Sequence, residues 1–282
     1  MLTGYENLDQ KTEIFSRGQL SLLAGLPGAG KTALAVNVVH NLLEIEKETR
    51  ILYITPGMPA QRLAERFIFL DSGISPYNLN FLNLDEKEIQ EAISGSAGRF
   101  QHFIDEKKLK IIDDNLLTIS DISSLCLDHF TDFDLIFVDY LQALKSSHGK
   151  EYASRSLIEI QLRELKKIAR KSGAAMVLIS QLKNYAGRPT AAELLPFSRL
   201  LSDEADKIIL LHRIDNPTGE RDWENEFNVN FNKIPEPVEL IVEKNISGCT
   251  GSFDFFWEPA TLAFRERTPE IEQYIKRLLR EI

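Results

Sequence analysis

The chain has 282 residues, 43% of them hydrophobic and 27% charged, and a formal net charge of −9 at pH 7. This length and composition predict a globular protein with a sizeable core. The acidic balance argues against a general polyanion-binding surface, although a few local basic loops are enough to hold nucleic acid. The sequence has no long apolar run and no signal-peptide pattern, and Cys126 and Cys249 show no metal-ligand spacing. We therefore expect a cytoplasmic protein with two reduced thiols and no membrane association.

Short apolar runs alternate with helical patterns along the chain, and the apolar runs predict buried strands. Strands are expected at residues 20–25, 51–55, 109–113, 134–140, 174–182 and 207–212, and a hairpin or edge pair at 238–244 and 252–258. Helices are expected at about 31–43, 59–70, 155–171 and 269–281, with another that starts at the capping pair Thr118 and Asp121. This alternation predicts an α/β fold, in which a mainly parallel, twisted sheet carries helices on both faces.

The order of elements favours one compact domain over residues 1–282, ending in the helix at about 269–281. Residues 213–239 are the most irregular stretch and are expected to form a long loop or a hairpin insertion.

A phosphate-binding motif stands between the first strand and its helix. Residues 25–32 read "GLPGAGKT" and fit G-x-x-x-x-G-K-[ST] in the required strand–loop–helix setting. The glycines let successive N–H groups face the phosphates, and the helix N-terminus favours the anion. Lys31 is expected to reach the β- and γ-phosphates of ATP, and Thr32 to hold Mg²⁺ through its hydroxyl. The predicted nucleotide-binding residues are Gly25, Pro27, Gly28, Ala29, Gly30, Lys31, Thr32 and Asp139.

Asp139 is the acid that belongs with this loop. It closes the apolar run "LIFVD", which is the place of a Walker B aspartate. An aspartate at a strand end is usually a turn former, but beside a phosphate-binding loop it predicts a second Mg²⁺ contact. Thr32 and Asp139 are therefore the predicted metal residues.

Several motifs together resemble one family, the DnaB replicative helicases, in their RecA-type motor domain. The similar segments are "TGYENLD", "GAGKTALAVNV", "DLIFVDYLQAL", "VLISQL" and "VEKNISGCTG", and the likeness extends over residues 3–264. The resemblance implies a RecA-like P-loop NTPase fold, with ATP and Mg²⁺ as cofactors. The RadA and KaiC families are more distant alternatives.

Two residues take a role in the ATPase reaction from this resemblance. Gln181 in "SQL" matches the family's γ-phosphate sensor; its alternative role is a buried glutamine at the sheet edge. Lys244 in "VEKN" matches a lysine that such helicases present to the neighbouring subunit's nucleotide, and its alternative role is an exposed strand-end lysine.

The loops after Gln142 and Leu182 correspond to the family's DNA-facing pore loops. Basic side chains there either meet single-stranded DNA or are simply solvated, and the sequence favours neither. The candidate DNA-binding residues are Lys145, Lys150, Arg155, Lys183, Arg188 and Arg199.

Two departures from the family concern the arginine finger, which acts on a neighbouring subunit, and the N-terminal domain, which supports ring assembly. The family's K-x-R pattern supplies an arginine finger in trans, but Ile246 stands at that position and cannot donate to phosphate. A missing finger costs about 10³ to 10⁵ in turnover. Because the motor-domain motifs start at residue 3, we expect no N-terminal primase-binding domain, and a hexameric ring is then possible but not assured.

A third departure is in "ILYITPGMP". Where the family has a motif like S-L-E-M-P, whose glutamate activates the attacking water, this chain reads Thr55-Pro56-Gly57-Met58-Pro59. Gly57 occupies the base position, and loss of a positioned base costs about 10² to 10⁴ in rate. Asp113, Asp114 and Glu65 are candidate substitutes, although the sequence does not bring them within reach.

These features lead to three hypotheses. The first is a DnaB-like replicative helicase domain that binds Mg-ATP and single-stranded DNA, with weak or absent autonomous hydrolysis. The second is a non-motor ATP-binding regulator or structural partner of a helicase or other replication proteins. The third is a RadA- or KaiC-like ATPase.

Overall fold

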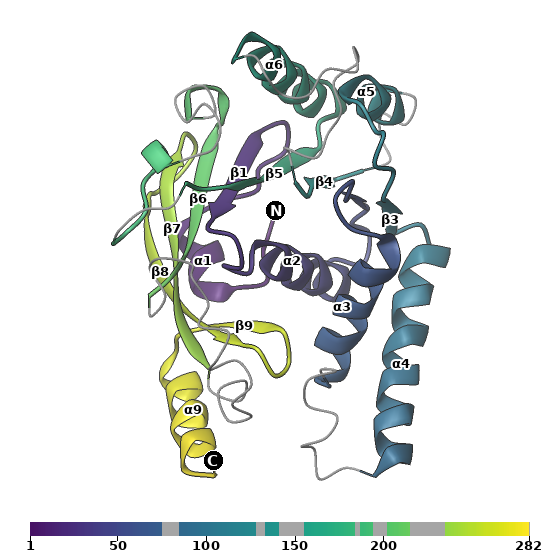
Figure 1. Cartoon of the computed structure of the whole chain (residues 1–282), viewed down its shortest axis with the longest axis vertical. Coiled ribbons are helices and arrows are strands. Elements are labelled where there is room, and N and C mark those ends of the chain that lie inside the picture. Colours follow the sequence, from purple (N-terminus) through teal and green to yellow (C-terminus); the bar gives the residue numbers. More distant parts are fainter. Residues whose placement is uncertain are drawn as a thin grey trace.

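The structure is a computed structural model of the chain and describes residues 1–74, 85–127, 133–140, 155–183, 187–193, 202–214 and 235–281. Within these residues nine strands form a single sheet in the order β3–β2–β4–β5–β1–β6–β7–β8–β9 (Figure 1). The strands are β1 (Leu20–Gly25), β2 (Ile51–Ile54), β3 (Leu109–Ile112), β4 (Leu135–Val138), β5 (Ala175–Gln181), β6 (Lys207–Arg213), β7 (Glu236–Asn245), β8 (Gly251–Glu258) and β9 (Ala263–Glu266).

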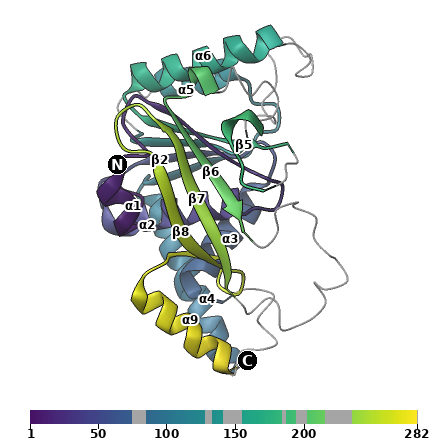
Figure 2. The same cartoon turned by 90° about the vertical axis from the view of Figure 1, so that its left-hand side faces the viewer.

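The sheet has a parallel part and an antiparallel part. The strands from β3 to β6 in this order run parallel, and β7, β8 and β9 continue the sheet antiparallel to their neighbours. Figure 2 shows β7 and β8 as a long pair beside β6. The predicted edge pair is therefore confirmed, and β9 extends it by a strand that the sequence analysis did not include.

The central parallel strands are apolar because helices cover both of their faces. All residues of β1, β2 and β4 are buried. Tyr53 of β2 and Phe137 of β4 are among the largest fully buried side chains, and their rings stack with centroids 5.5 Å apart. This packing explains why short apolar runs were enough to predict the sheet.

Helices lie on the two faces in separate groups. On one face α5 (Ile119–Leu127) packs against α6 (Arg155–Ser172), and on the other lie α2 (Lys31–Ile45), α3 (Ala60–Ser72) and α4 (Glu86–Asp105) (Figure 1). The α/β fold class with helices on both faces is therefore confirmed. None of the described helices has the length and apolar character that a membrane-spanning helix requires.

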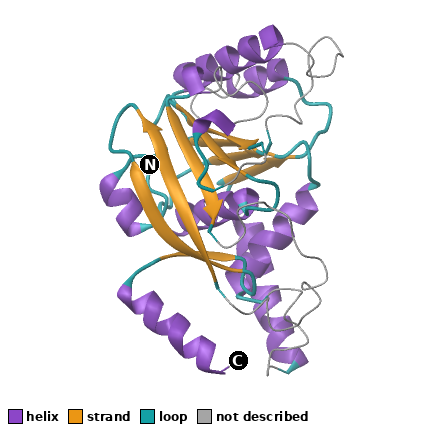
Figure 3. Cartoon of the chain, turned by 60° about the vertical axis from the view of Figure 1, so that its left-hand side comes forward, coloured by secondary structure: helices purple, strands orange, loops and turns teal. Residues whose placement is uncertain are grey.

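Three further helical segments lie outside these two groups. They are α1 (Glu6–Lys11), the 3₁₀ turn η2 (Ala191–Glu193) and α9 (Pro269–Glu281). The helix α9 follows β9 and lies near the end of the β7–β8 pair that is remote from α6 (Figure 3). Its bounds agree with the expected C-terminal helix.

The helix α4 was not predicted from the sequence, because its inward face is only partly apolar. Phe100, Phe103 and Ile104 are partly buried against the core, and the remaining surface is mostly polar. A capping box starts the helix: Asp85 accepts a hydrogen bond from the Glu88 amide at 2.7 Å, and the Glu88 side chain accepts one from the Asp85 amide at 3.0 Å.

The expected capping pair at the start of α5 is present. The Thr118 hydroxyl accepts from the Asp121 amide at 3.3 Å, and an Asp121 carboxylate oxygen accepts from the Thr118 amide at 2.8 Å. Of the expected loop or insertion at 213–239, residues 215–234 lie outside the described residues, and β7 already begins at Glu236.

Candidate nucleotide-binding site

The phosphate-binding loop, residues 25–32, begins where β1 ends in the middle of the sheet. Gly25 is in register with Gln181 of β5 on one side and with Leu211 of β6 on the other. Ligands of open α/β sheets bind outside the carboxyl ends of the parallel strands. The fold therefore places this loop, and Gln181 beside it, at the carboxyl-terminal ends of the parallel strands, where a ligand site is expected.

Glycine is required at several positions of this loop for steric reasons. Gly28 and Gly30 have φ angles of 74° and 97°, in the left-handed region that residues with a Cβ rarely adopt. A Cβ at Gly25 would lie 2.8 Å from the Leu211 carbonyl oxygen. The loop thus depends on its glycines for its conformation as well as for access to its amides.

Lys31 folds back over the loop. Its ammonium donates to the carbonyl oxygens of Gly25 at 2.9 Å and of Leu26 at 2.7 Å. Burial lowers the pKa of Lys31 to about 8, and the nearby carboxylate of Asp139 opposes this shift. The ammonium is therefore held at the loop by two neutral acceptors, which a phosphate oxygen can replace with a stronger, charge-assisted bond.

Asp139 follows β4 and is 5% exposed. The Tyr53 hydroxyl donates to one of its carboxylate oxygens at 2.9 Å, and the Thr32 side chain is a second hydrogen-bond partner. Burial raises the pKa of Asp139, while Thr32, Tyr53 and the positive charges of Lys31 and Arg66 act to lower it. The structure thus brings together Lys31, Thr32 and Asp139, which the sequence analysis had assigned to phosphate and Mg²⁺.

The donor set of this corner fits a magnesium nucleotide. It combines backbone amides and a lysine for phosphate with a hydroxyl and a carboxylate, and Mg²⁺ prefers such oxygen ligands. Arg66 of α3 adds a positive charge that acts on both Asp139 and Tyr53. The sequence analysis missed Arg66; its position one turn after Leu63, a residue expected on the buried face of the predicted helix, was the available signal.

Gly57 lies in the turn that follows β2. The turn is held by the Met58 amide, which donates to the Thr55 carbonyl oxygen at 3.2 Å, and by the Thr55 hydroxyl, which donates to the Met58 carbonyl oxygen at 3.1 Å. A Cβ at Gly57 would lie 2.7 Å from Cε1 of Tyr140, the residue after Asp139. The turn is therefore next to the candidate site, and the ring of Tyr140 fills the space that a side chain at position 57 needs.

The three candidate substitutes for a base all have local partners. Asp113 accepts a hydrogen bond at 2.8 Å from the first backbone amide of α3, and Asp114 accepts one at 2.8 Å from the amide two residues later. Glu65 accepts a hydrogen bond at 3.2 Å from the side-chain amide one helical turn earlier. Each carboxylate has a structural role where it stands, and no described contact links any of them to Asp139 or Lys31.

Comparison with known proteins decides the family. Residues 1–266 match the family described as the DnaB-like helicase C terminal domain. The chain belongs to this family. The match favours the DnaB resemblance over the more distant RadA and KaiC ones.

Named relatives of this DnaB-like domain are replicative helicases. The probable plasmid replicative DNA helicase of Chlamydia muridarum is 30% identical over 268 residues, which cover 93% of this chain and 54% of that protein. The replicative DNA helicase DnaB of Mycoplasma pneumoniae is 26% identical over 283 residues, which cover 95% of this chain and 57% of that protein. The chain thus spans about half the length of the curated relatives it matches.

A solved structure shares the fold. It is a DnaB-like replicative helicase, studied with its interactions with primase, and it superposes with a TM-score of 0.75 at 22% identity. The superposition covers 95% of this chain and 63% of that one. At this identity the likeness shows that the DnaB-like domain has a RecA-like ATPase-domain fold.

Lys244 lies at the opposite end of the strands from the phosphate-binding loop. It is in register with Ile208, which pairs with Leu22 of β1, three residues and about 10 Å before Gly25. Its ammonium donates to the carbonyl oxygens of Ser202 at 2.8 Å and Ala205 at 2.6 Å. Within this chain Lys244 therefore does not reach the phosphate-binding loop.

Ile246, at the expected arginine-finger position, lies two residues after Lys244, at the same end of the strands. Its side chain is 59% exposed, and its amide donates to the Asp206 carbonyl oxygen at 3.2 Å. An exposed isoleucine at this edge cannot provide the charge of a guanidinium.

Among the candidate DNA-binding residues, Arg188 has a partner in its own chain. Its guanidinium makes two hydrogen bonds with the carboxylate of Glu239, at 2.8 and 3.0 Å, and another with the Ser252 hydroxyl. Lys183 is exposed at the end of β5. Lys145, Lys150 and Arg199 lie outside the described residues, and of Arg155 only the backbone, at the start of α6, is described.

Arg213 is a second residue that the sequence analysis missed. From the end of β6 it donates to the Gly28 carbonyl oxygen at 3.2 Å and forms an ion pair with Glu236. The positively charged side chain of Arg213 thus contacts the middle of the phosphate-binding loop. Its position at the end of a predicted parallel strand was the available signal, but the sequence did not reveal that β6 lies directly beside β1.

Proposed function

We propose that this DnaB-like domain binds Mg-ATP at the phosphate-binding loop and has weak or absent autonomous hydrolysis. The observation that carries the proposal is that Lys31, Thr32 and Asp139 converge beside the turn after β2. In this turn Gly57, which has no side chain, stands at the position expected for the catalytic base.

The binding half of the proposal follows from the donors. The loop amides and the ammonium of Lys31 hold the phosphates, and Thr32 and Asp139 hold Mg²⁺ directly or through water. Bound Mg²⁺ supplies charge neutralisation to the β- and γ-phosphates. Gln181, in register with Gly25, is proposed as the group that contacts the γ-phosphate side of the ligand.

The hydrolytic half of the proposal follows from what the chain lacks at two positions. Gly57 has no side chain to orient water, and Tyr140 fills the adjacent space. Ile246 has no charge to offer a neighbouring active site. Both differences from the family affect the hydrolysis step. We therefore propose that ATP dissociates from this chain more often than it is hydrolysed.

We further propose that the domain binds single-stranded DNA and works within a replicative helicase assembly. The family membership and the named relatives support this, as does the exposed Lys183. The neighbouring solved helicase is described with primase, which makes replication proteins the class of partner to test. A homo-oligomeric ring, with Lys244 facing the next subunit, belongs to the same proposal.

The test is a pair of measurements on the purified chain. Affinity for Mg-ATP and for a non-hydrolysable analogue is measured by calorimetry, and steady-state phosphate release is measured with and without single-stranded DNA. We expect micromolar or tighter binding with turnover at the detection limit. Robust DNA-stimulated turnover would refute the hydrolytic half, and absent binding would refute the site.

The second candidate is a non-motor, ATP-binding regulator or structural partner of a helicase. The specific observation in its favour is the Tyr140 ring packed over Gly57, because a side chain at position 57 would first have to displace this ring. The two candidates differ in strand separation by the assembled complex. A helicase subunit unwinds a forked duplex when assembled, whereas a regulator changes a partner's unwinding without moving on DNA itself.

A further inference from the structure

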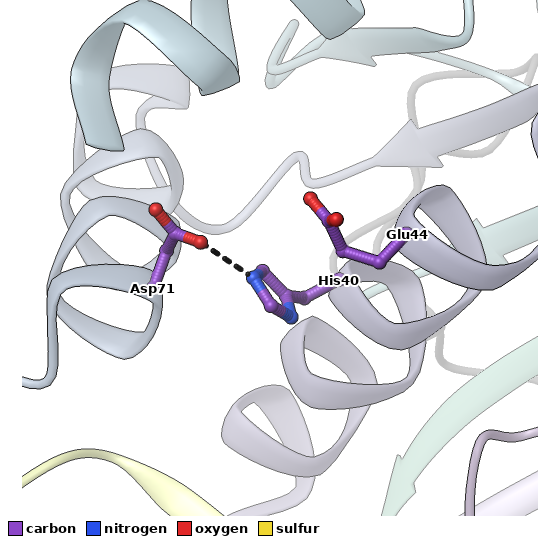
Figure 4. Close-up of side chains that lie close together, drawn as sticks. All are labelled: His40, Glu44 and Asp71. Carbon is purple, nitrogen blue, oxygen red and sulfur yellow. Dashed lines mark hydrogen bonds and ion pairs between the residues drawn. The ribbon is translucent and has the colours of Figure 1, made fainter. Parts of the chain in front are cut away.

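A cluster of metal-ligating side chains lies between α2 and α3, away from the nucleotide site. His40 and Glu44 are one turn apart on α2, and Asp71 reaches them from α3 (Figure 4). One ligand atom from each of the three lies within 4.8 Å of the others. The i, i+4 spacing places the imidazole and the carboxylate on the same face of α2.

The distance between His40 and Asp71 suits two ligands of one ion. The imidazole Nε2 and the carboxylate Oδ1 are 3.0 Å apart. Bonds of about 2.1 Å at a right angle place two ligand atoms about 3 Å apart, and a tetrahedral angle widens this only to about 3.4 Å. An ion can therefore replace the shared hydrogen between these atoms with a small movement of either side chain.

Asp71 is oriented by a residue from a third helix. Arg99 of α4 donates through Nε to Oδ2 at 2.9 Å, and this leaves Oδ1 directed at His40. Burial alone would raise the pKa of Asp71, but hydrogen bonds from Arg99, Ser96 and His40 outweigh it, so the pKa lies below its usual range. A ligating carboxylate with its outer oxygen held in this way is the usual arrangement around protein metals.

Glu44 is the third group. Its side chain is exposed, and among the described residues no hydrogen-bond or ion-pair partner is found for it. Figure 4 shows its carboxylate beside the imidazole of His40. A carboxylate without a described partner next to a histidine–aspartate pair supplies a further negative ligand that the pair itself lacks.

We infer that His40, Glu44 and Asp71 form a binding site for a divalent transition-metal ion of the Zn²⁺ class. An imidazole with two carboxylates suits Zn²⁺, Co²⁺ or Ni²⁺, and three protein ligands leave an open position for water. Mg²⁺ prefers an all-oxygen shell, so the imidazole disfavours it relative to Zn²⁺. The site is distinct from the nucleotide's Mg²⁺ site, because His40 lies nine residues, or about 13 Å, along α2 from Lys31.

The ion would connect two helices that border the nucleotide site. The helix α2 starts at Lys31, and α3 starts just after the turn that contains Gly57. Metal bound between them stabilises the folded state, because the unfolded chain does not keep these three ligands together.

The test uses the whole chain with Cys249→Ser, so that the exposed thiol contributes no ligand. Thermal unfolding is followed with ZnCl₂ and with MgCl₂, and CoCl₂ binding is followed by its visible absorption. We expect a rise in Tm of about 5 °C once free Zn²⁺ exceeds its dissociation constant by about 100-fold, and no rise with Mg²⁺.

Two ligand variants and two matched controls locate the ion. Glu44→Gln and His40→Gln should each weaken Zn²⁺ and Co²⁺ binding by at least about 10-fold. Glu48→Gln and His102→Gln remove an exposed carboxylate and an exposed imidazole elsewhere, and should leave binding unchanged. Absence of saturable metal binding, or equal binding by the ligand variants and the controls, overturns the inference; the exposed position of Glu44 keeps the test independent of folding.

Discussion

The phosphate-binding loop and the turn after β2 lie close together at one edge of the sheet, but they are occupied in opposite ways. In the loop, glycines leave space and Lys31, Thr32 and Asp139 converge on it. In the turn, glycine leaves space that the Tyr140 ring takes up. The difference teaches that the residues for nucleotide binding and those for hydrolysis occupy separate places in this fold, and it is the basis of our proposal that this chain binds nucleotide but hydrolyses it poorly.

The largest expected effect is the restoration of ATP hydrolysis by a carboxylate at position 57. We expect Gly57→Glu to succeed only with Tyr140→Ala, because the added Cβ would otherwise lie 2.7 Å from the ring. Phosphate release in the presence of single-stranded DNA should then rise by about 10² or more. Ile246→Arg should add to this rise wherever subunits assemble.

The matched control for this restoration is Gly57→Gln with Tyr140→Ala. It has the same volume and no carboxylate, and it should stay at the starting rate. Equal rates for the glutamate and glutamine variants would show that position 57 does not face the attacking water.

The binding half of the comparison is tested by Lys31→Ala. Loss of the ammonium removes charge-assisted bonds to phosphate, and Mg-ATP affinity should fall roughly 10- to 100-fold in calorimetry. Lys47→Ala, which removes an exposed lysine just beyond α2, should bind as the unchanged chain does. Full affinity in the Lys31 variant would mean that the loop is not the site.

The pH dependence of binding sharpens the same point. Burial lowers the pKa of Lys31 to about 8 in the free protein. Phosphate binds the protonated ammonium, so above pH 8 binding must take up a proton, and affinity should fall by up to about tenfold per pH unit. Titrations between pH 7 and 9.5 check this; Lys31→Met should abolish the slope, and a flat profile for the unchanged chain contradicts it.

The lowered pKa of Lys31 also makes the free energy of unfolding depend on pH. Between pH 8 and the higher pKa of an unfolded lysine, the unfolded chain binds more protons than the folded one, so the buried Lys31 makes stability increase with pH in that window. Lys207, whose burial lowers its pKa to about 8 as well, acts in the same direction. Denaturant titrations at pH 7.5 and 9 would measure their sum.

The smallest effect concerns Arg188. Its ion pair with Glu239 is more than half exposed on the arginine side, so Arg188→Ala should cost less than about 1 kcal/mol of folding free energy. Glu239→Gln instead removes the charged partner of the guanidinium, and affinity for single-stranded DNA should rise a few-fold at low salt if Arg188 faces the nucleic acid. Fluorescence anisotropy at two salt concentrations decides, and no change assigns Arg188 to a structural role.

Much of the fold could be predicted because its signals are local. The apolar runs of β1, β2 and β4 are buried along their whole length, and the strand–loop–helix order around Lys31 is written in consecutive residues. The helix α4 escaped because its inward face is half polar, and β9 because only two of its four residues, Ala263 and Phe264, are apolar.

The parts of the site that could not be predicted depend on contacts between distant segments. Tyr140 meets Gly57 only because β2 and β4 are neighbours in the sheet. Arg213 meets Gly28 only because β6 lies beside β1. No periodicity in the chain reports which strands are adjacent, so the ring over Gly57 required the three-dimensional structure.

In the proposed ring, Lys244 would couple subunit association to local order. Its ammonium holds the carbonyl oxygens of Ser202 and Ala205 within its own chain. A subunit that extended this lysine to a neighbour's nucleotide would first have to release those carbonyls. By thermodynamic reciprocity, anything that tightens residues 202–205 then weakens that contact between subunits, and any neighbour that captures the lysine loosens this segment.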